Sequence, residues 1–126
     1  MSKLVIEETP KTPEIIFDPE EGTLSMKGRS IPENSLAFYE PIFAAIDAYT
    51  SSPKPLTKVL LYFEYFSTSS SKCILDIFKK FEGIHKAGHE VNITWYYEDR
   101  DENMRDAGVD YEAIVYVPFS IEQFKE

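Results

Sequence analysis

The densest hydrophobic stretch lies in the middle of the chain. From Leu56 to Phe66, aliphatic, aromatic and β-branched residues follow one another with few polar interruptions. This run is too continuous for a half-exposed strand, so we predict a central strand that is buried on both faces of a sheet. Beyond residue 71 the apolar side chains recur at helical spacing, at Ile74, Ile77, Phe78, Phe81 and Ile84. The pattern predicts a strand that leads directly into an amphipathic helix.

Strand-like segments and one helical segment precede the central strand. Residues 4–6 form a short piece that suits an edge strand or an arm. Residues 14–18 and 23–27 also have strand patterns, and the turn residues between them predict an antiparallel hairpin. Apolar residues at helical spacing then predict a helix over 35–49, with Pro41 either kinking it or marking the first turn of a second segment.

Strands and helices alternate after the central helix, which we expect Gly88 to end. A strand pattern at 91–97 precedes a short helix over 98–108, with Asp99 as its N-cap and Gly108 as its end. A last strand is predicted at 113–119. This order predicts an α/β fold in which a mixed β-sheet has helices packed on it. A chain of 126 residues fits a single domain over residues 1–126.

Five consecutive hydroxyl residues separate the central strand from the central helix: Ser67, Thr68, Ser69, Ser70 and Ser71. A helix that starts here leaves its first backbone N–H groups at the carboxyl edge of the sheet, at the positive end of the helix dipole. Anions bind well at such a position, and open α/β sheets carry functional sites at this edge. Ordinary N-capping explains one of the five hydroxyls and leaves four without a structural role in the sequence.

Charge narrows the range of partners. The chain has 13 basic and 22 acidic residues, a formal charge of -9. This balance disfavours nucleic acids and anionic membranes as partners and favours proteins. We find no signal-peptide pattern and no segment long enough to insert in a membrane, and the single Cys73 supports no internal disulfide. We therefore expect a cytoplasmic protein.

Side chains that could carry catalysis or hold a metal are sparse. The sequence lacks a phosphate-binding glycine loop, a paired-cysteine motif and a nucleophile elbow. His85 and His89 are four residues apart, but the predicted helix end at Gly88 separates them, which favours surface positions over metal ligands. Cys73 fits a packed residue better than a nucleophile. The carboxylates within residues 98–106 lack the spacing of a calcium loop. We therefore predict that the protein is not an enzyme and that it binds no metal or cofactor.

One segment has a recognisable signature. Residues Tyr65–Cys73, in which an aliphatic strand passes through Ser-Thr-Ser-Ser-Ser into a helix, closely resemble the SiaC-like bacterial regulatory phosphoproteins. The resemblance continues through Ser30–Asn34, Phe38–Pro41, Thr94–Glu98 and the acidic stretch that ends at Gly108. That family is similar in outline to the STAS domains of anti-sigma-factor antagonists, in which a kinase modifies a Ser or Thr after a central strand. The resemblance implies a STAS-like sheet.

The resemblance also implies a function and a site. Thr68 is the implied phosphoacceptor, and the partner-binding surface around it comprises Ser67, Ser69, Ser70, Ser71 and Lys72. A Ser/Thr kinase of the anti-sigma type would phosphorylate Thr68, and a PP2C-like phosphatase would restore it. The unmodified form would bind and activate a diguanylate cyclase, in cyclic di-GMP signalling and biofilm control. Ser67 stands where Asn is expected in the family, which makes Ser67 and Ser69 further candidate acceptors.

Two other functions fit the hydroxyl run alone. In the first, Thr68 to Ser71 cradle a phosphate-bearing small molecule, although no glycine-rich loop allows its close approach. In the second, a small hydrolase or transferase uses Thr68 or Cys73 as its nucleophile. That chemistry needs a neighbouring base, and the sequence places neither histidine to serve as one.

Overall fold

The computed structural model describes residues 2–125, which contain one six-stranded sheet and three helices. The strands are β1 (Leu4–Ile6), β2 (Glu14–Asp18), β3 (Thr23–Ser30), β4 (Leu56–Phe66), β5 (Glu90–Tyr97) and β6 (Phe119–Gln123), and the helices are α1 (Ser35–Tyr49), α2 (Thr68–Lys86) and α3 (Glu102–Ile114). The strands follow one another across the sheet in sequence order. β1, β2 and β3 pair antiparallel, whereas β3 to β6 pair parallel. The predicted mixed sheet, hairpin and edge strand are confirmed.

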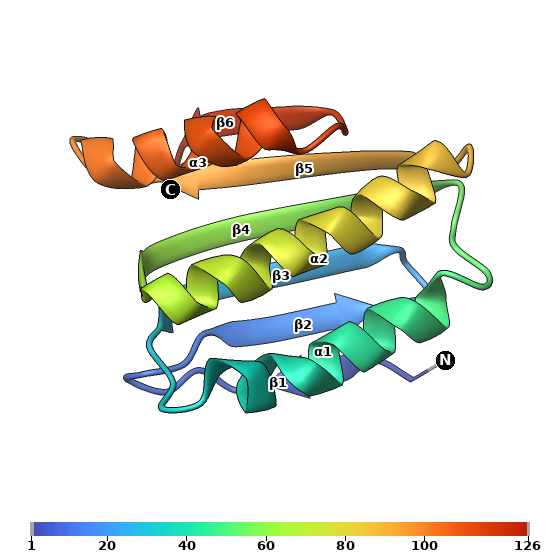
Figure 1. Ribbon diagram of the computed structural model, residues 1–126, viewed down its shortest axis with the longest axis horizontal. Coiled ribbons are helices and arrows are strands. Elements are labelled where there is room, and N and C mark those ends of the chain that lie inside the picture. Colours follow the sequence, from blue (N-terminus) through green and yellow to red (C-terminus); the bar gives the residue numbers. More distant parts are fainter. Residues whose placement is uncertain (1, 126) are drawn as a thin grey trace.

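All three helices lie on the same face of the sheet (Figure 1). Burial along β4 therefore alternates: Thr57, Val59, Leu61 and Phe63 are buried, while Lys58, Leu60 and Glu64 are exposed. The prediction that this strand is buried on both faces is wrong. From β3 to β6 each new strand is added on the same side of the previous one, and each connection has the same handedness. Every helix is therefore placed on one face of the sheet, and the other face is left uncovered.

Helices α1 and α2 occupy the segments that their apolar spacing predicts. α1 begins after Asn34, whose side-chain oxygen accepts the backbone N–H of Ala37 at 3.1 Å. Pro41 lies inside this single helix and does not divide it. α2 begins at Thr68, so four of the five hydroxyl residues belong to its first turn. Gly88 follows its end with φ of 105°, a left-handed conformation that confirms the predicted stop signal.

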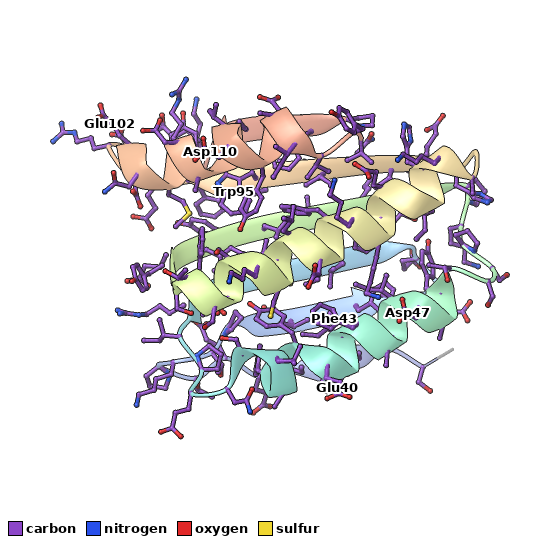
Figure 2. The ribbon with its side chains drawn as sticks, viewed as in Figure 1. Glu40, Phe43, Asp47, Trp95, Glu102 and Asp110 are labelled. Carbon is purple, nitrogen blue, oxygen red and sulfur yellow. The ribbon has the colours of Figure 1, made fainter. Side chains whose placement is uncertain are left out.

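The third helix lies further along the chain than its cap signals predict. α3 runs from Glu102 to Ile114, with Asp101 rather than Asp99 as its N-cap. Gly108 lies inside the helix, where a Cβ would come within 2.5 Å of Cδ1 of the buried Trp95. The missing side chain therefore allows α3 to pack directly against Trp95, which Figure 2 shows between α2 and α3. The predicted last strand over 113–119 is also displaced, since Ile114 is helical and β6 begins only at Phe119.

The ends of β3 and β4 position the site that the sequence singles out. The two strands are parallel neighbours, and Ser30 pairs with Phe66 at their carboxyl ends. The chain leaves Ser30 for α1 and Phe66 for α2, so the first turns of these helices meet at one edge of the sheet (Figure 1). No helix within residues 2–125 has the length and apolar character needed to cross a bilayer.

Candidate functional site

Thr68 stands apart from the other hydroxyl residues of the run. It is the first residue of α2, and its side chain is exposed. Its hydroxyl makes no hydrogen bond to any residue of the described part of the chain, 2–125. A free hydroxyl at the first position of a helix is open to modification, and the positive end of the helix dipole favours negative charge there.

Three of the remaining serines hold the first turn of α2 in place. The hydroxyl of Ser67 accepts the backbone N–H of Ser70 at 3.2 Å, which makes Ser67 the N-cap. Ser69 lies 2.8 Å from the hydroxyl of Ser35 at the start of α1. Ser71 donates to the carbonyl oxygen of Thr68 at 2.6 Å. Apart from Thr68, the hydroxyls that N-capping alone did not explain are therefore bonded within the protein.

Ser70 is the buried centre of this hydroxyl network. Its side chain is fully buried, donates to the carbonyl oxygen of Ser30 at 3.0 Å and accepts from the Ser30 hydroxyl at 2.8 Å. The Tyr39 hydroxyl lies 2.7 Å from the Ser30 hydroxyl, and burial raises the pKa of Tyr39 to about 12, so this phenol stays neutral. The expectation that Ser70 belongs to a partner-binding surface is wrong, because no partner can reach it.

A shallow groove of about 700 Å³ lies beside Thr68, between the first turns of α1 and α2. Its lining is Glu33, Asn34, Ser35, Leu36, Thr68, Ser69, Lys72, Cys73 and Asp76. Leu36 is 64% exposed, although its neighbours in the helical pattern are buried. An exposed leucine beside a free hydroxyl, with charged side chains at the rim, has the composition of a protein-binding surface rather than of a core.

Sequence reasoning missed the contribution of α1 to this site. Leu36 is one of the apolar residues whose spacing predicts the helix over 35–49, but the buried stripe is Ser35, Tyr39, Ile42, Ile46 and Tyr49. The spacing alone does not separate the two positions, because steps of three and of four back from Tyr39 reach residues 36 and 35 alike. The Ser35 and Ser30 contacts to α2 carry no local signal, since their partners are 34 to 40 residues away.

The geometry argues against the two other functions considered from the sequence. Carboxylates of Glu33 and Asp76 line the groove and would repel a free phosphate-bearing ligand. Burial raises the pKa of the Cys73 thiol, and the charge of Asp76 raises it further. A buried, protonated thiol is a poor nucleophile. Neither histidine belongs to the groove lining, so neither serves Thr68 or Cys73 as a base.

The histidines and carboxylates also lie apart from one another. His85 lies within α2, whereas His89 follows its end. Residues 2–125 hold no cluster of three or more His, Cys, Asp or Glu side chains that could bind a metal ion. The acidic residues of the α3 region are mostly exposed along the helix and its leading turn.

Comparison with known proteins identifies the family. The model of the SiaC family regulatory phosphoproteins matches residues 6–124. This chain belongs to the SiaC family. An uncharacterized protein of Pseudomonas aeruginosa (strain UCBPP-PA14) is 31% identical over 126 residues, covering 100% of both sequences. As a member of a family of regulatory phosphoproteins, the chain acts in signal transduction and is not an enzyme, which agrees with the prediction.

Solved SiaC structures share the fold. SiaC of Pseudomonas aeruginosa is 30% identical and superposes with a TM-score of 0.89, covering 98% of this chain and 100% of that one. A second structure, of the diguanylate cyclase SiaD in complex with its activator SiaC from Pseudomonas aeruginosa, gives 30% identity and a TM-score of 0.91, over 96% of this chain and 99% of that one. The resemblance drawn from the Tyr65–Cys73 signature and the mixed α/β sheet are thus both confirmed.

Proposed function

We propose that this protein is a partner switch controlled at Thr68. The unmodified form binds and activates a diguanylate cyclase. A Ser/Thr kinase of the anti-sigma type phosphorylates Thr68 and abolishes binding, and a PP2C-like phosphatase restores it. The observation that carries this proposal is the contrast within the hydroxyl run: Thr68 alone is both exposed and unbonded within residues 2–125, while its neighbours are committed to the fold.

The cyclase partner is inferred from the family. SiaC of Pseudomonas aeruginosa is described as the activator of the diguanylate cyclase SiaD, and the chain seen in that complex is similar to this one over nearly its whole length. The partner-binding surface is centred on Thr68, Ser69 and Lys72, which are exposed, and includes Leu36 from α1. Ser67 and Ser71 are half-buried at its edge.

Phosphorylation would change this surface while sparing the fold. A phosphoryl group adds about 1.5 to 2 negative charges at neutral pH. Inside the protein, the N-terminus of α2 favours that charge, and the bonded serines beneath it stay in place. When a partner covers the groove, the same charge must lose its water, beside carboxylates that already line the groove. Phosphorylation is therefore expected to weaken partner binding rather than to destabilise the fold.

The experiment that tests the proposal compares wild type with Thr68→Ala and Thr68→Asp. Each protein is titrated calorimetrically against the purified diguanylate cyclases of the source organism, and cyclase activity is measured alongside. We expect wild type and Thr68→Ala to bind and activate one cyclase, and Thr68→Asp to do neither. Peptide mapping of the protein from its own cells should find phosphate on Thr68. Equal binding by all three proteins, or phosphate confined to Ser67 or Ser69, would contradict the assignment.

A further inference from the structure

The groove beside Thr68 continues along the two helices that form it. A second hollow of about 360 Å³ is lined by Phe43, Asp76, Lys79 and Lys80. Asp76 belongs to both hollows, so they are parts of one groove between α1 and α2. From Thr68 to Lys80 the groove follows α2 for about 18 Å, at 1.5 Å per residue. That length corresponds to about three turns of a helix.

The α1 wall of the groove offers two apolar side chains. Leu36 and Phe43 are seven residues apart and therefore lie on one side of the helix, two turns from each other. Leu36 is largely exposed, and Phe43 is half-buried below the Lys80 ammonium group, 5.5 Å from its ring centre. Figure 2 shows Phe43 between α1 and α2, with Glu40 on the opposite side of α1. The wall that faces α2 is therefore apolar at both ends.

The α2 wall offers two unpaired charges of opposite sign. Lys72 and Asp76 are exposed, four residues apart, and neither forms an ion pair with another described residue. Lys80 differs, because its ammonium group contacts the carboxylate of Asp47 at 2.7 Å. Near Thr68 the α2 wall thus presents one free cation and one free anion, with the exposed Glu33 carboxylate elsewhere in the lining, while the Lys80 charge at the far end is already paired.

We propose that this groove binds an amphipathic helix of the cyclase partner. The apolar stripe of that helix covers Leu36 and Phe43, and its flank toward α2 carries a carboxylate opposite Lys72 and a cation opposite Asp76, one turn further on. This inference rests on the proposed function and adds to it the shape and chemistry of the partner. Spacings of four and seven residues on the two walls match the periodicity of a helix lying in a groove. An extended segment would instead need an open sheet edge, which the groove does not contain.

The same arrangement gives the switch a mechanism. Thr68 and Lys72 are four residues apart on α2, a spacing at which side chains of opposite charge pair. A phosphoryl group on Thr68 would take Lys72 as its own partner and repel the carboxylate of the incoming helix. It would also bring a strongly hydrated charge beside the apolar contact of Leu36. The docked helix loses its charge pair and its apolar contact at the same end.

The apolar wall is tested by Leu36→Glu and Phe43→Ala, with affinity for the purified cyclase measured by calorimetry. We expect each variant to weaken binding at least about tenfold, as truncation or charging of an interface anchor does. Val109→Glu is the matched control, because Val109 is 40% exposed on α3, outside the groove. It should bind within about twofold of wild type. A substitution at Leu36 is less able to disturb the fold than one at Phe43, because Leu36 is not part of the hydrophobic core. Circular dichroism tests whether all three variants are folded.

The charged wall is tested by Lys72→Glu and Asp76→Lys. Each should weaken cyclase binding by about five- to tenfold at low salt, with a smaller loss near 1 M salt, where the Debye length is about 3 Å. Lys58→Glu makes the same change of net charge as Lys72→Glu, but on the uncovered sheet face, and should leave affinity unchanged. Hydrogen exchange on the cyclase should show new protection over one helix.

Each result supports or overturns the inference. If Leu36→Glu and Asp76→Lys bind like wild type while Thr68→Asp does not bind, the groove is not the docking site and the Thr68 switch stands. Protection confined to a loop or strand of the cyclase overturns the helical partner. If wild type binds no cyclase at all, the proposed function fails and the docked helix fails with it.

Discussion

Two helices begin at the same edge of the sheet with opposite chemistry (Figure 1). α2 is capped by the neutral Ser67, and its first turn contains no acidic residue. α3 is capped by Asp101, whose carboxylate accepts the backbone N–H of Met104 at 3.1 Å, and its first turn contains Glu102. Figure 2 shows Glu102 at that end of α3. The positive end of one helix thus has permanent negative charge, and that of the other has none.

The difference suggests a division of roles between the two helix starts. Negative charge stabilises the N-terminus of either helix. At α3 a carboxylate supplies that charge, whereas at α2 the position holds a hydroxyl that a kinase can modify. The hydroxyl network below fixes the backbone of that turn, so that charge added at Thr68 changes the surface rather than the fold. The following predictions test this comparison, in order of decreasing expected effect.

The largest effect is expected where the start of α2 is anchored. Ser70→Ala removes two buried hydrogen bonds, to the Ser30 carbonyl and from the Ser30 hydroxyl, and leaves these groups with only the Ser67 N–H and the Tyr39 hydroxyl as partners. We expect the free energy of unfolding, measured in urea, to fall by about 2 to 3 kcal/mol. Thr68→Ala, two residues away on the exposed side, should change it by less than about 0.5 kcal/mol. Equal losses from both variants would remove the distinction between anchor and switch.

The next effect concerns a glycine in each helix. Gly108→Ala in α3 would place a Cβ 2.5 Å from the ring of Trp95, which is fully buried and has little room to shift. We expect a loss of about 1 to 3 kcal/mol in unfolding free energy from overpacking. Gly83 in α2 is the matched control, since a Cβ there meets no atom of the described residues within 4 Å. Gly83→Ala should stabilise by up to about 1 kcal/mol, and its destabilisation would contradict this reading.

A smaller effect is expected at the cap of α3. Asp101→Ala removes the acceptor of the Met104 N–H and should lower the unfolding free energy by about 1 kcal/mol. Asp101→Ser keeps a capping oxygen without the charge, so the difference between the two variants separates the hydrogen bond from the dipole interaction. If alanine and serine behave alike in thermal unfolding, the cap hydrogen bond contributes nothing to stability.

The sequence predicts elements best where local periodicity decides them. The α2 stripe from Ile74 to Ile84 and the β2–β3 hairpin follow from spacing and turn residues alone. The exposure of Leu60 on β4 cannot be predicted from local spacing, because it depends on which face of the sheet the three helices cover. The start of α3 was misplaced because Asp99 and Asp101 both suit an N-cap, whereas Arg100 has a φ of 70°, which no helix beginning at Asp99 could contain.

The candidate site divides in the same way. Thr68 and Lys72 are found from the hydroxyl run and the family signature, since both lie in one continuous segment. The burial of Ser70 and the contribution of Leu36 cannot be found in this way, because both depend on α1 meeting α2, more than 30 residues away in the chain. A run of similar residues states which chemistry is present, and tertiary contacts decide which members remain available for it.

The smallest effect concerns the charge that separates the two helix starts. Thr68→Asp should raise the unfolding free energy by about 0.3 to 1 kcal/mol relative to Thr68→Asn, because its carboxylate lies at the positive end of α2. Glu102→Gln should lower it by a similar amount at α3. Both differences should shrink when thermal unfolding is repeated near 1 M salt. A Thr68→Asp protein less stable than Thr68→Asn would mean that negative charge at Thr68 strains the fold, and the loss of partner binding could then no longer be assigned to the surface alone.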